Sequence, residues 1–224
     1  MPDALIFDID GTLLDSVDLH ARAWEEAFQH FGHNIPFEEI RGQIGKGGDQ
    51  LMPFFLSPDE VKRRGKEIEQ FRGDLFKKKY LKDVKPFPGV RALFEKAIDN
   101  GQKVALASSA KADELEHYKK LAKIEDLVDA ETSSADAERS KPHPDIFEAA
   151  VDRLGKEITP DRVIIIGDSP YDVEAAKKAG IRTVCVRCGG FPDAVLQEAG
   201  CIALYDNPED LLRNYASSPL VPDK

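Results

Sequence analysis

The 224-residue sequence has few cysteines, no excess of basic residues and no long apolar run. Its three cysteines, Cys185, Cys188 and Cys201, lie late in the chain, and no second pair is present that would complete a zinc site. Cys185-x-x-Cys188 has the spacing of a redox pair, but Cys185 falls inside the strand pattern from Thr183 to Val186. We therefore expect reduced thiols in the core or in a loop.

The sequence also lacks positive charge. Asp and Glu number 41 against 31 Lys and Arg, which gives a formal net charge of -10. Non-specific binding to nucleic acid or to an acidic membrane needs a basic face, so we expect neither partner. An anionic substrate would need lysines gathered locally.

No apolar stretch reaches the roughly 18 residues of a membrane span. The first residues, Met-Pro-Asp, lack the basic-then-apolar layout of a signal peptide. We therefore expect a cytoplasmic protein. The length suits one large domain or two smaller ones, and the hydrophobic content of 42% is enough to fill a core.

What the sequence does have is a short apolar run, Ala4 to Phe7, that ends in two aspartates, Asp8 and Asp10. Open α/β sheets hold their ligands at the carboxyl ends of their strands. Aspartates one residue apart in an extended segment point to the same face, and Gly11 lets the chain turn away. Two acids in one small site need a counter-charge, which indicates a divalent cation such as Mg²⁺.

Strand and helix patterns alternate through most of the chain. Apolar strands are expected at residues 104–107, 128–130, 163–166, 183–186 and 201–204, with helices at 90–98, 111–122, 144–154, 170–178 and 208–213. Repeated strand–helix units indicate a parallel sheet covered by helices on both faces. The expected fold class is thus α/β, with a Rossmann-like core.

Residues 17–85 interrupt this alternation with helical patterns and no convincing strand. Helices are expected at 17–31 and 58–82, with a glycine-rich turn at 42–49 between them. Pro86 and Pro88 then close the insert like a hinge. We therefore expect an α/β core made of residues 1–16 and 86–224, and an inserted helical domain at 17–85.

A second apolar strand, at residues 163–166, also ends in acids, Asp168 and Asp172. A simple turn followed by an acid that the helix dipole favours would give the same pattern. Two acidic strand ends in one parallel sheet favour a metal site instead, in which Asp8, Asp10, Asp168 and Asp172 are the candidate ligands.

The string D-x-D-G-T-L-x-D-S, placed directly after an amino-terminal hydrophobic strand, resembles the first motif of the haloacid dehalogenase superfamily. The likeness is to its β-phosphoglucomutase and phosphoglycolate phosphatase branch. It implies Mg²⁺-dependent phosphoryl transfer, with a helical cap that closes over the site. It also implies that Asp8 takes the phosphoryl group as an aspartyl phosphate and that Asp10 is the general acid and then the base.

Three further motifs of that superfamily have matching residues. Ser108 matches a hydroxyl that bonds a phosphoryl oxygen, although serine before a helix is also a common cap. Lys141, followed by Pro142, matches a cation that neutralises the nucleophile, although a lone loop lysine is usually just solvated. Asp168 matches a direct metal ligand, and Asp172 matches an acid that supports the metal's water or Lys141.

The resemblance also implies residues that bind the substrate. These are Thr12, His20, Lys46, Ser109 and Lys111. Lys111 would hold a phosphate at the start of a helix, His20 would lie near Asp10, and Lys46 would be a contact from the cap. Alternatively, His20 and Trp24 share one helical face and belong to a core, and the glycines around Lys46 form a flexible turn.

The expected function is a Mg²⁺-dependent phosphatase acting on a small phosphorylated metabolite, such as a sugar phosphate or phosphoglycolate. A hexose-phosphate mutase is the alternative within the branch. Gly167 stands where those mutases tend to have Glu, and Ala110 replaces a phosphate-binding hydroxyl, which favours the phosphatase.

Outside that family, the alternatives are a phosphorylatable switch like a receiver domain and a binding protein without catalysis. Receivers have a different motif order and no helical insert, and joint retention of Asp8, Asp10, Lys141 and Asp168 disfavours an idle protein. A cap that covers the site reduces the need for a second subunit, so we expect a monomer.

Overall fold

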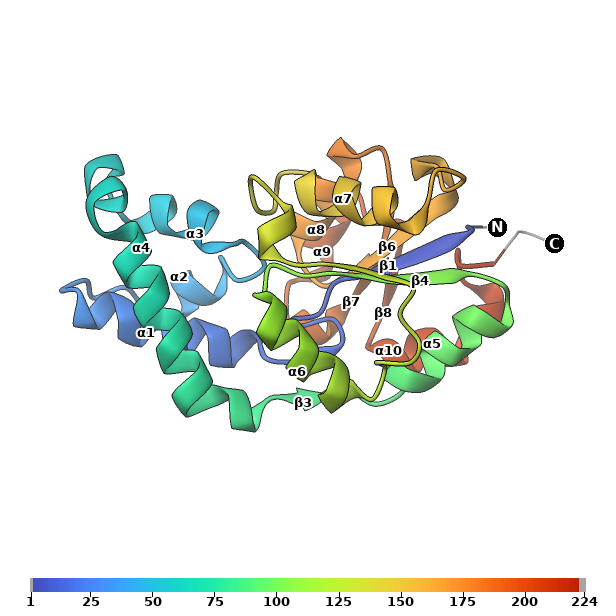
Figure 1. Cartoon of the computed structure of the whole chain (residues 1–224), viewed down its shortest axis with the longest axis horizontal. Helices are drawn as coiled ribbons and strands as arrows, with labels where there is room; N and C mark the ends of the chain where they lie inside the picture. Colours follow the sequence, from blue (N-terminus) through green and yellow to red (C-terminus); the bar gives the residue numbers. More distant parts are fainter. Residues whose placement is uncertain (1, 222–224) are drawn as a thin grey trace.

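The computed structural model describes residues 2–221, built around a six-stranded sheet (Figure 1). The strands are β1 (Ala4–Phe7), β4 (Lys103–Ala107), β5 (Ala130–Thr132), β6 (Val163–Gly167), β7 (Arg182–Val186) and β8 (Ala203–Tyr205). Their order across the sheet is β5-β4-β1-β6-β7-β8, and every pairing is parallel. The expected α/β fold with a Rossmann-like parallel sheet is confirmed.

Side chains alternate along each strand, so the apolar strands give the sheet two apolar faces. Helices cover both of these faces. Leu5 and Phe7 of β1 face the helices α5 (Val90–Asp99), α6 (Ala112–Ala122) and α10 (Pro208–Arg213). Ala4 and Ile6 face the other layer, which contains α7 (Asp145–Leu154) and α8 (Pro170–Lys178). A shorter helix, α9 (Asp193–Ala199), packs Leu196 against Val173 and Cys185. The strands are thus buried from both sides.

Four helices lie together at one end of the molecule, on the left in Figure 1. They are α1 (Val17–His30), α2 (Phe37–Arg41), α3 (Gly48–Phe55) and α4 (Pro58–Leu75). They share a hydrophobic cluster of their own, which includes Trp24, Phe28, Leu51 and Ile68. Ala23, Phe76 and Tyr80 nevertheless belong to the cluster under the sheet, so the helical region is packed directly onto the core.

The chain leaves and re-enters the core through a two-stranded antiparallel ribbon. Its strands are β2 (Leu14–Asp15) and β3 (Lys85–Pro86). The ribbon lies where the hinge was expected. The division into a core at 1–16 and 86–224 and a helical domain at 17–85 stays a prediction, and residues 1 and 222–224 lie outside the described part of the chain.

The structure corrects several expected boundaries. The glycine-rich turn ends early, because α3 already begins at Gly48. The long helix expected at 58–82 is α4 followed by a π turn (Phe76–Tyr80) and a 3₁₀ turn (Leu81–Asp83). β5 and β8 lie about two residues later than expected, and β3 places a strand residue, Lys85, inside the range read as strand-free. Two-residue strands are too short to leave a periodic pattern.

The remaining 3₁₀ turns are Ser134–Asp136, Pro160–Arg162, Arg187–Gly189 and Tyr215–Ser217.

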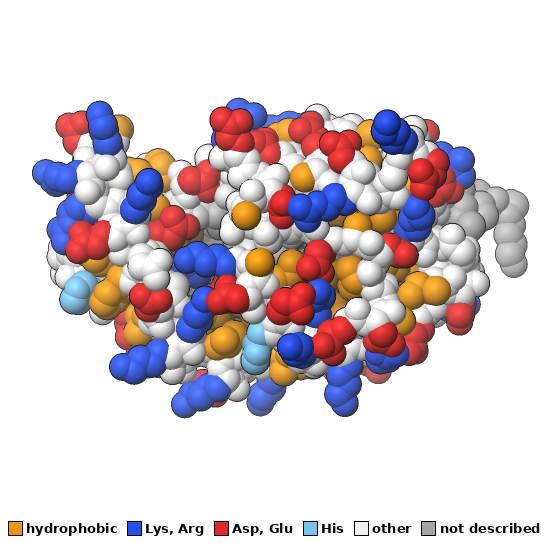
Figure 2. Space-filling view, in the orientation of Figure 1, with side chains coloured by type: hydrophobic (Ala, Val, Ile, Leu, Met, Phe, Trp, Pro, Cys, Tyr) orange, Lys and Arg blue, Asp and Glu red, His pale blue; other side chains and the backbone are white. Residues whose placement is uncertain are grey.

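Two further expectations concern the thiols and the surface. Cys185, Cys188 and Cys201 are free thiols, as expected. Within residues 2–221, no helix is long and apolar enough to cross a membrane. On the face seen in Figure 2, basic and acidic side chains are interspersed, so that face offers nucleic acid no continuous basic patch.

Candidate active site

Polar residues gather at the carboxyl ends of three neighbouring strands. Asp8 follows β1, Ser108 follows β4 and Asp168 follows β6. β1 pairs with both β4 and β6, and the chain order across the sheet reverses there. Such a reversal opens a crevice at the strand ends, which is where open α/β sheets bind ligands.

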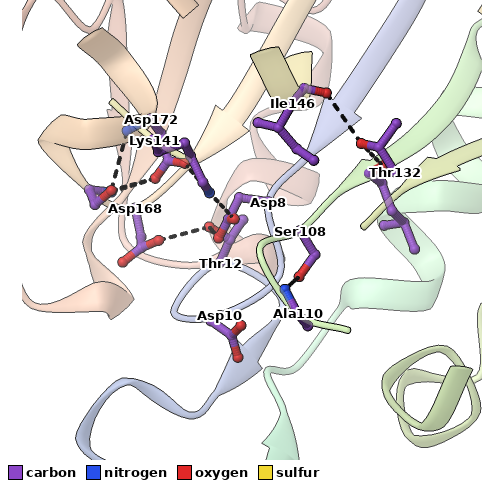
Figure 3. A network of polar contacts seen from close by, with 12 residues as sticks. Asp8, Asp10, Thr12, Ser108, Ala110, Thr132, Lys141, Ile146, Asp168 and Asp172 are labelled. Atoms are coloured by element: carbon purple, nitrogen blue, oxygen red, sulfur yellow. Dashed lines mark hydrogen bonds and ion pairs between the residues drawn. The ribbon is translucent and has the colours of Figure 1, made fainter. Parts of the chain in front are cut away.

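Lys141 links two carboxylates within this crevice (Figure 3). Its ammonium nitrogen lies 2.5 Å from Oδ1 of Asp8 and 2.8 Å from Oδ1 of Asp172. All three residues are buried, with 2% of Lys141 exposed. Burial lowers the pKa of Lys141, but Asp172 and Asp8 outweigh that effect and hold the pKa above its ordinary value. Lys141 is therefore a permanent positive charge between two acids.

Asp8, Asp168 and Asp172 form a compact group of acids. One oxygen from each lies within 4.8 Å of the others. Thr12 places its hydroxyl 3.2 Å from Oδ2 of Asp8 and 3.1 Å from Oδ1 of Asp168, which ties the two strand ends together. Burial raises the pKa of Asp8 to about 7, and burial together with Asp172 and Asp8 raises the pKa of Asp168 well above its ordinary value.

These residues fit a divalent cation by charge and by donor chemistry. When ionised, the three carboxylates exceed the single ammonium group by two negative charges in a buried site. Carboxylate oxygens are the ligands that Mg²⁺ prefers in proteins. Asp8, Asp168 and Asp172 are therefore able to hold Mg²⁺.

Asp10 lies apart from that group of acids (Figure 3). Its Oδ1 accepts a hydrogen bond from the Ser16 hydroxyl at 2.6 Å and lies 3.0 Å from Nε2 of His20. Burial would raise the pKa of Asp10, but His20 and Ser16 hold it below its ordinary value. His20, in turn, stacks on Phe76 with ring centroids 4.0 Å apart. Metal binding by Asp10 stays a prediction.

Ser108 is not the cap of the following helix, because the N-cap of α6 is Lys111. Its hydroxyl accepts a hydrogen bond from the amide of Ala110 at 3.0 Å, in the turn before that helix. Its bond to a phosphoryl oxygen stays a prediction. The residue is also fully buried at the end of β4, beside the acids. Ser109 is half-buried and lines the cavity above them.

A cavity opens over the acids and runs between the core and the helical region. Its lining includes Asp8, Asp10, His20, Lys46 and Lys141. Burial lowers the pKa of Lys46, whose amine donates to Oε1 of Gln43 and lies 4.5 Å from the ring centroid of Tyr171. Lys46 is thus held over the site rather than free in a flexible turn.

Lys111 is not part of this lining. It is exposed at the start of α6 and lines a smaller adjoining cavity instead. The structure therefore brings Thr12, His20, Lys46 and Ser109 around the acids, and places Lys111 further out.

Sequence reasoning missed several residues around the site. A Cβ at Gly189 would overlap the carboxylate of Asp168, so this glycine is required by a close approach. Glu69, Arg72 and Glu114 line the cavity from α4 and α6. A helical stripe identifies buried positions but does not say which polar neighbours border a cavity, so no signal in the sequence singled them out.

Comparison with known proteins decides the family. The model of the family "Haloacid dehalogenase-like hydrolase" matches residues 5–186. The chain belongs to the haloacid dehalogenase-like hydrolase family. The expectation of an enzyme of this family is thereby confirmed.

Relatives in this family cover nearly the whole chain. A phosphorylated carbohydrates phosphatase of Thermotoga maritima is 30% identical over 215 residues, which are 94% of this chain and 96% of the relative. A phosphoglycolate phosphatase of Nitrosospira multiformis is 28% identical, with 90% of each chain covered. Among solved structures, a hydrolase from Pseudomonas syringae has a TM-score of 0.85 and 26% identity, with 96% of this chain and 98% of that chain covered.

Proposed function

We propose that the protein is a Mg²⁺-dependent phosphatase that hydrolyses a small phosphorylated metabolite of the sugar phosphate or phosphoglycolate type. One observation carries the proposal: Asp8, Asp168 and Asp172 form a compact buried group at the open end of the sheet, and Lys141 contacts Asp8 and Asp172. The names of the relatives from Thermotoga maritima and Nitrosospira multiformis agree with this chemistry.

The acids and Lys141 have different electrostatic roles. Asp8, Asp168 and Asp172 would hold Mg²⁺, which would supply positive charge to stabilise the phosphoryl group during transfer. Lys141 holds the Asp8 carboxylate in place through its 2.5 Å contact and offers a second positive charge. Thr12 fixes the separation of Asp8 and Asp168. The arrangement reduces the repulsion between an anionic nucleophile and an anionic substrate.

The first step transfers the phosphoryl group to the protein. A carboxylate oxygen of Asp8 bonds to phosphorus, and the bond between phosphorus and the leaving oxygen breaks. The leaving oxygen takes a proton from the carboxyl group of Asp10. His20 and Ser16 hold the pKa of Asp10 below its ordinary value in the resting structure, and the negative charge of an arriving substrate raises that pKa and favours the protonated form.

The second step restores the protein. Water bonds to phosphorus and gives its proton to the Asp10 carboxylate, and the bond between phosphorus and Asp8 breaks. Inorganic phosphate leaves, and the carboxylate of Asp8 is regenerated. Asp10 thus serves as acid in one step and as base in the next.

The helical region closes the site from above, as a cap made of residues 17–85. The hydroxyl of Tyr171 donates to the carbonyl of Gly42 at 2.6 Å, and the amide of Ser140 donates to Oδ2 of Asp49 at 3.1 Å. These contacts bridge the core and the cap beside Lys46 and Lys141. A closed cap excludes water from the phosphoryl group, and its release would admit the substrate.

The test is phosphate release from a panel of phosphorylated metabolites, including glucose phosphates and phosphoglycolate, with Mg²⁺ and with a chelator. We expect Mg²⁺-dependent release that the variant Asp8→Asn abolishes. Isomerisation of a hexose phosphate without release would replace the phosphatase by a mutase. A stable aspartyl phosphate without turnover would replace it by a phosphorylatable switch.

A further inference from the structure

Arg72, on α4, has a guanidinium group without an acidic partner in the described residues. Several other arginines form ion pairs: Arg91 contacts Glu95 and Asp126, and Arg187 contacts Asp193 and Asp206. Among residues 2–221, Arg72 forms no ion pair, and its Nε is buried without a hydrogen-bond partner. A buried donor without an acceptor is unfavourable, and most such donors in native proteins are satisfied. The guanidinium group of Arg72 therefore has no acidic partner within the described residues, and Arg72 lines the cavity above the acids.

Arg72 lies on the wall of the cavity and beside the ring of Trp24. Its Cζ lies 5.0 Å from the centroid of the Trp24 ring, a cation–π contact that restrains the guanidinium group. The hydrogen-bond donors of arginine lie in its plane, in a fork that matches the two oxygens of a carboxylate or phosphoryl group. The contact with Trp24 thus restrains the guanidinium group without using its hydrogen-bond donors.

Two cavities meet at Arg72. The larger one contains Asp8, Asp10 and Lys141, and the smaller one contains Lys77 and Lys111. The residues that line both are Glu69, Arg72, Ser109, Glu114 and Ser134. A substrate whose phosphoryl group lies at Asp8 would therefore extend its alcohol part toward Arg72.

We propose that the alcohol part of the substrate carries a second anionic group, a carboxylate or a second phosphoryl group, and that Arg72 binds it. This inference rests on the proposed function and narrows its substrate class. Glu69 and Glu114 line the same space, so the long-range field there is not strongly positive. The second anionic group of the substrate is therefore selected by short-range, paired hydrogen bonds to Arg72. The two glutamates repel anions that do not reach Arg72.

The kinetic test compares matched substrates. One pair is phosphoglycolate and ethylene glycol phosphate, which differ by a carboxylate. The other is glucose 1,6-bisphosphate and glucose 1-phosphate, which differ by a phosphoryl group. p-Nitrophenyl phosphate is the common reference. The variants are Arg72→Gln, Arg72→Lys and, as a matched control on the exposed side of α4, Arg63→Gln.

In one of the two pairs, we expect the wild-type protein to have a higher kcat/KM for the substrate that carries the second anionic group. The pair that shows this preference identifies the anionic group as a carboxylate or a phosphoryl group. Arg72→Gln should lose roughly 10- to 100-fold on that member, the scale of charge-assisted hydrogen bonds, and far less on p-nitrophenyl phosphate. Arg72→Lys, which keeps the charge but not the fork, should fall between, and Arg63→Gln should match wild type. No preference in either pair, or equal losses on all substrates, would overturn the inference.

Binding of phosphonates tests the role of Arg72 independently of turnover. Calorimetry in the presence of Mg²⁺ compares phosphonoacetate with methylphosphonate, and propane-1,3-bisphosphonate with propylphosphonate, because phosphonates are not hydrolysed by this chemistry. The wild-type protein should bind one second-anion member more tightly, and Arg72→Gln should remove that advantage. An advantage that survives in Arg72→Gln, or is absent from wild type, overturns the inference. Failure of the proposed function would show separately, as no Mg²⁺-dependent hydrolysis of any ester.

Discussion

The ammonium group of Lys141 lies 2.5 Å from the carboxylate of Asp8, although 133 residues separate the two in the chain. The parallel sheet makes this contact possible, because Asp8 follows its central strand and Lys141 precedes a helix that packs on the same sheet. The same ammonium group also contacts Asp172, so it connects the first and last acids of the site. Charge balance in the site therefore depends on a single lysine.

Replacement of Lys141 by methionine should abolish turnover and weaken the fold. Asp8 and Asp172 would lose their buried partner, and breaking such a pair typically costs about 3–5 kcal/mol of unfolding free energy. Lys177→Met, at an exposed position on α8, is the control. Phosphate release and urea unfolding measure both effects. Turnover by Lys141→Met close to that of wild type would contradict its assigned role.

The contact between His20 and Asp10 predicts a shift in pH dependence. His20 lowers the pKa of Asp10, so His20→Gln should raise that pKa. The first step uses the protonated carboxyl group of Asp10, so the basic limb of the kcat/KM profile should move to higher pH. His117→Gln, at an exposed position on α6, should leave the profile unchanged. An identical profile for His20→Gln and wild type would remove His20 from the mechanism.

Asp10→Asn tests the proton transfer directly. The amide cannot donate or accept the transferred proton, so hydrolysis of alkyl phosphates should slow by roughly 10²-fold or more. p-Nitrophenyl phosphate has a leaving group that needs less protonation, so the rate of its first step should fall by a smaller factor. Steady-state kinetics on both esters provide the comparison. An unchanged rate on the alkyl ester would exclude Asp10 as the acid.

Mg²⁺ should stabilise the protein more at pH 8 than at pH 5.5. The raised pKa values of Asp8 and Asp168 mean that the folded protein without metal holds protons that the unfolded chain releases. Their contribution to stability is present in acid and is lost as pH rises from about 4 through about 7. Mg²⁺ binds the deprotonated carboxylates, so its stabilising effect grows over the same range.

Scanning calorimetry with Mg²⁺ and with chelator at the two pH values measures this effect. Asp168→Asn should reduce the Mg²⁺-dependent rise in Tm, whereas Asp161→Asn, at an exposed position, should keep it. A rise in Tm that is equal at both pH values would contradict the assignment of these carboxylates.

Two buried threonines provide a stability test away from the site. Oγ1 of Thr183, in β7, is buried without a hydrogen-bond partner, so Thr183→Val should raise the unfolding free energy by about 1 kcal/mol. Oγ1 of Thr132, in β5, donates to the carbonyl of Ile146 at 3.2 Å, so Thr132→Val should lower it by about 1 kcal/mol. Urea unfolding compares the two, and effects of the same sign would contradict this view of the hydrogen bonds.

The sheet and the acids at its edge were predictable because they depend on local patterns. The apolar run before Asp8 and the apolar run before Asp168 each specify a buried strand, and parallel strands bring their carboxyl ends together. The resemblance to the superfamily added Lys141, which no periodicity would have selected from a loop.

The details of the cap were not predictable in the same way. Gly48 and Pro53 lie inside α3, and both residue types usually signal turns, so the pattern at 42–49 predicts a turn over the first residues of this helix. Arg72 sits in a helix with many exposed charges, and only packing against Trp24 distinguishes it from its neighbours. Gly189 matters because of its approach to Asp168, a contact between distant segments that leaves no local pattern.

Trapping the phosphorylated protein tests the central claim most directly. The enzyme is mixed with a hydrolysed ester and Mg²⁺, quenched in acid within the first turnovers, and mapped by peptide mass spectrometry, with Asp8→Asn as the control. The account predicts one phosphoryl group on the peptide that contains Asp8, present in wild type and absent from Asp8→Asn. A phosphoryl group on another residue, or normal turnover by Asp8→Asn, would contradict it.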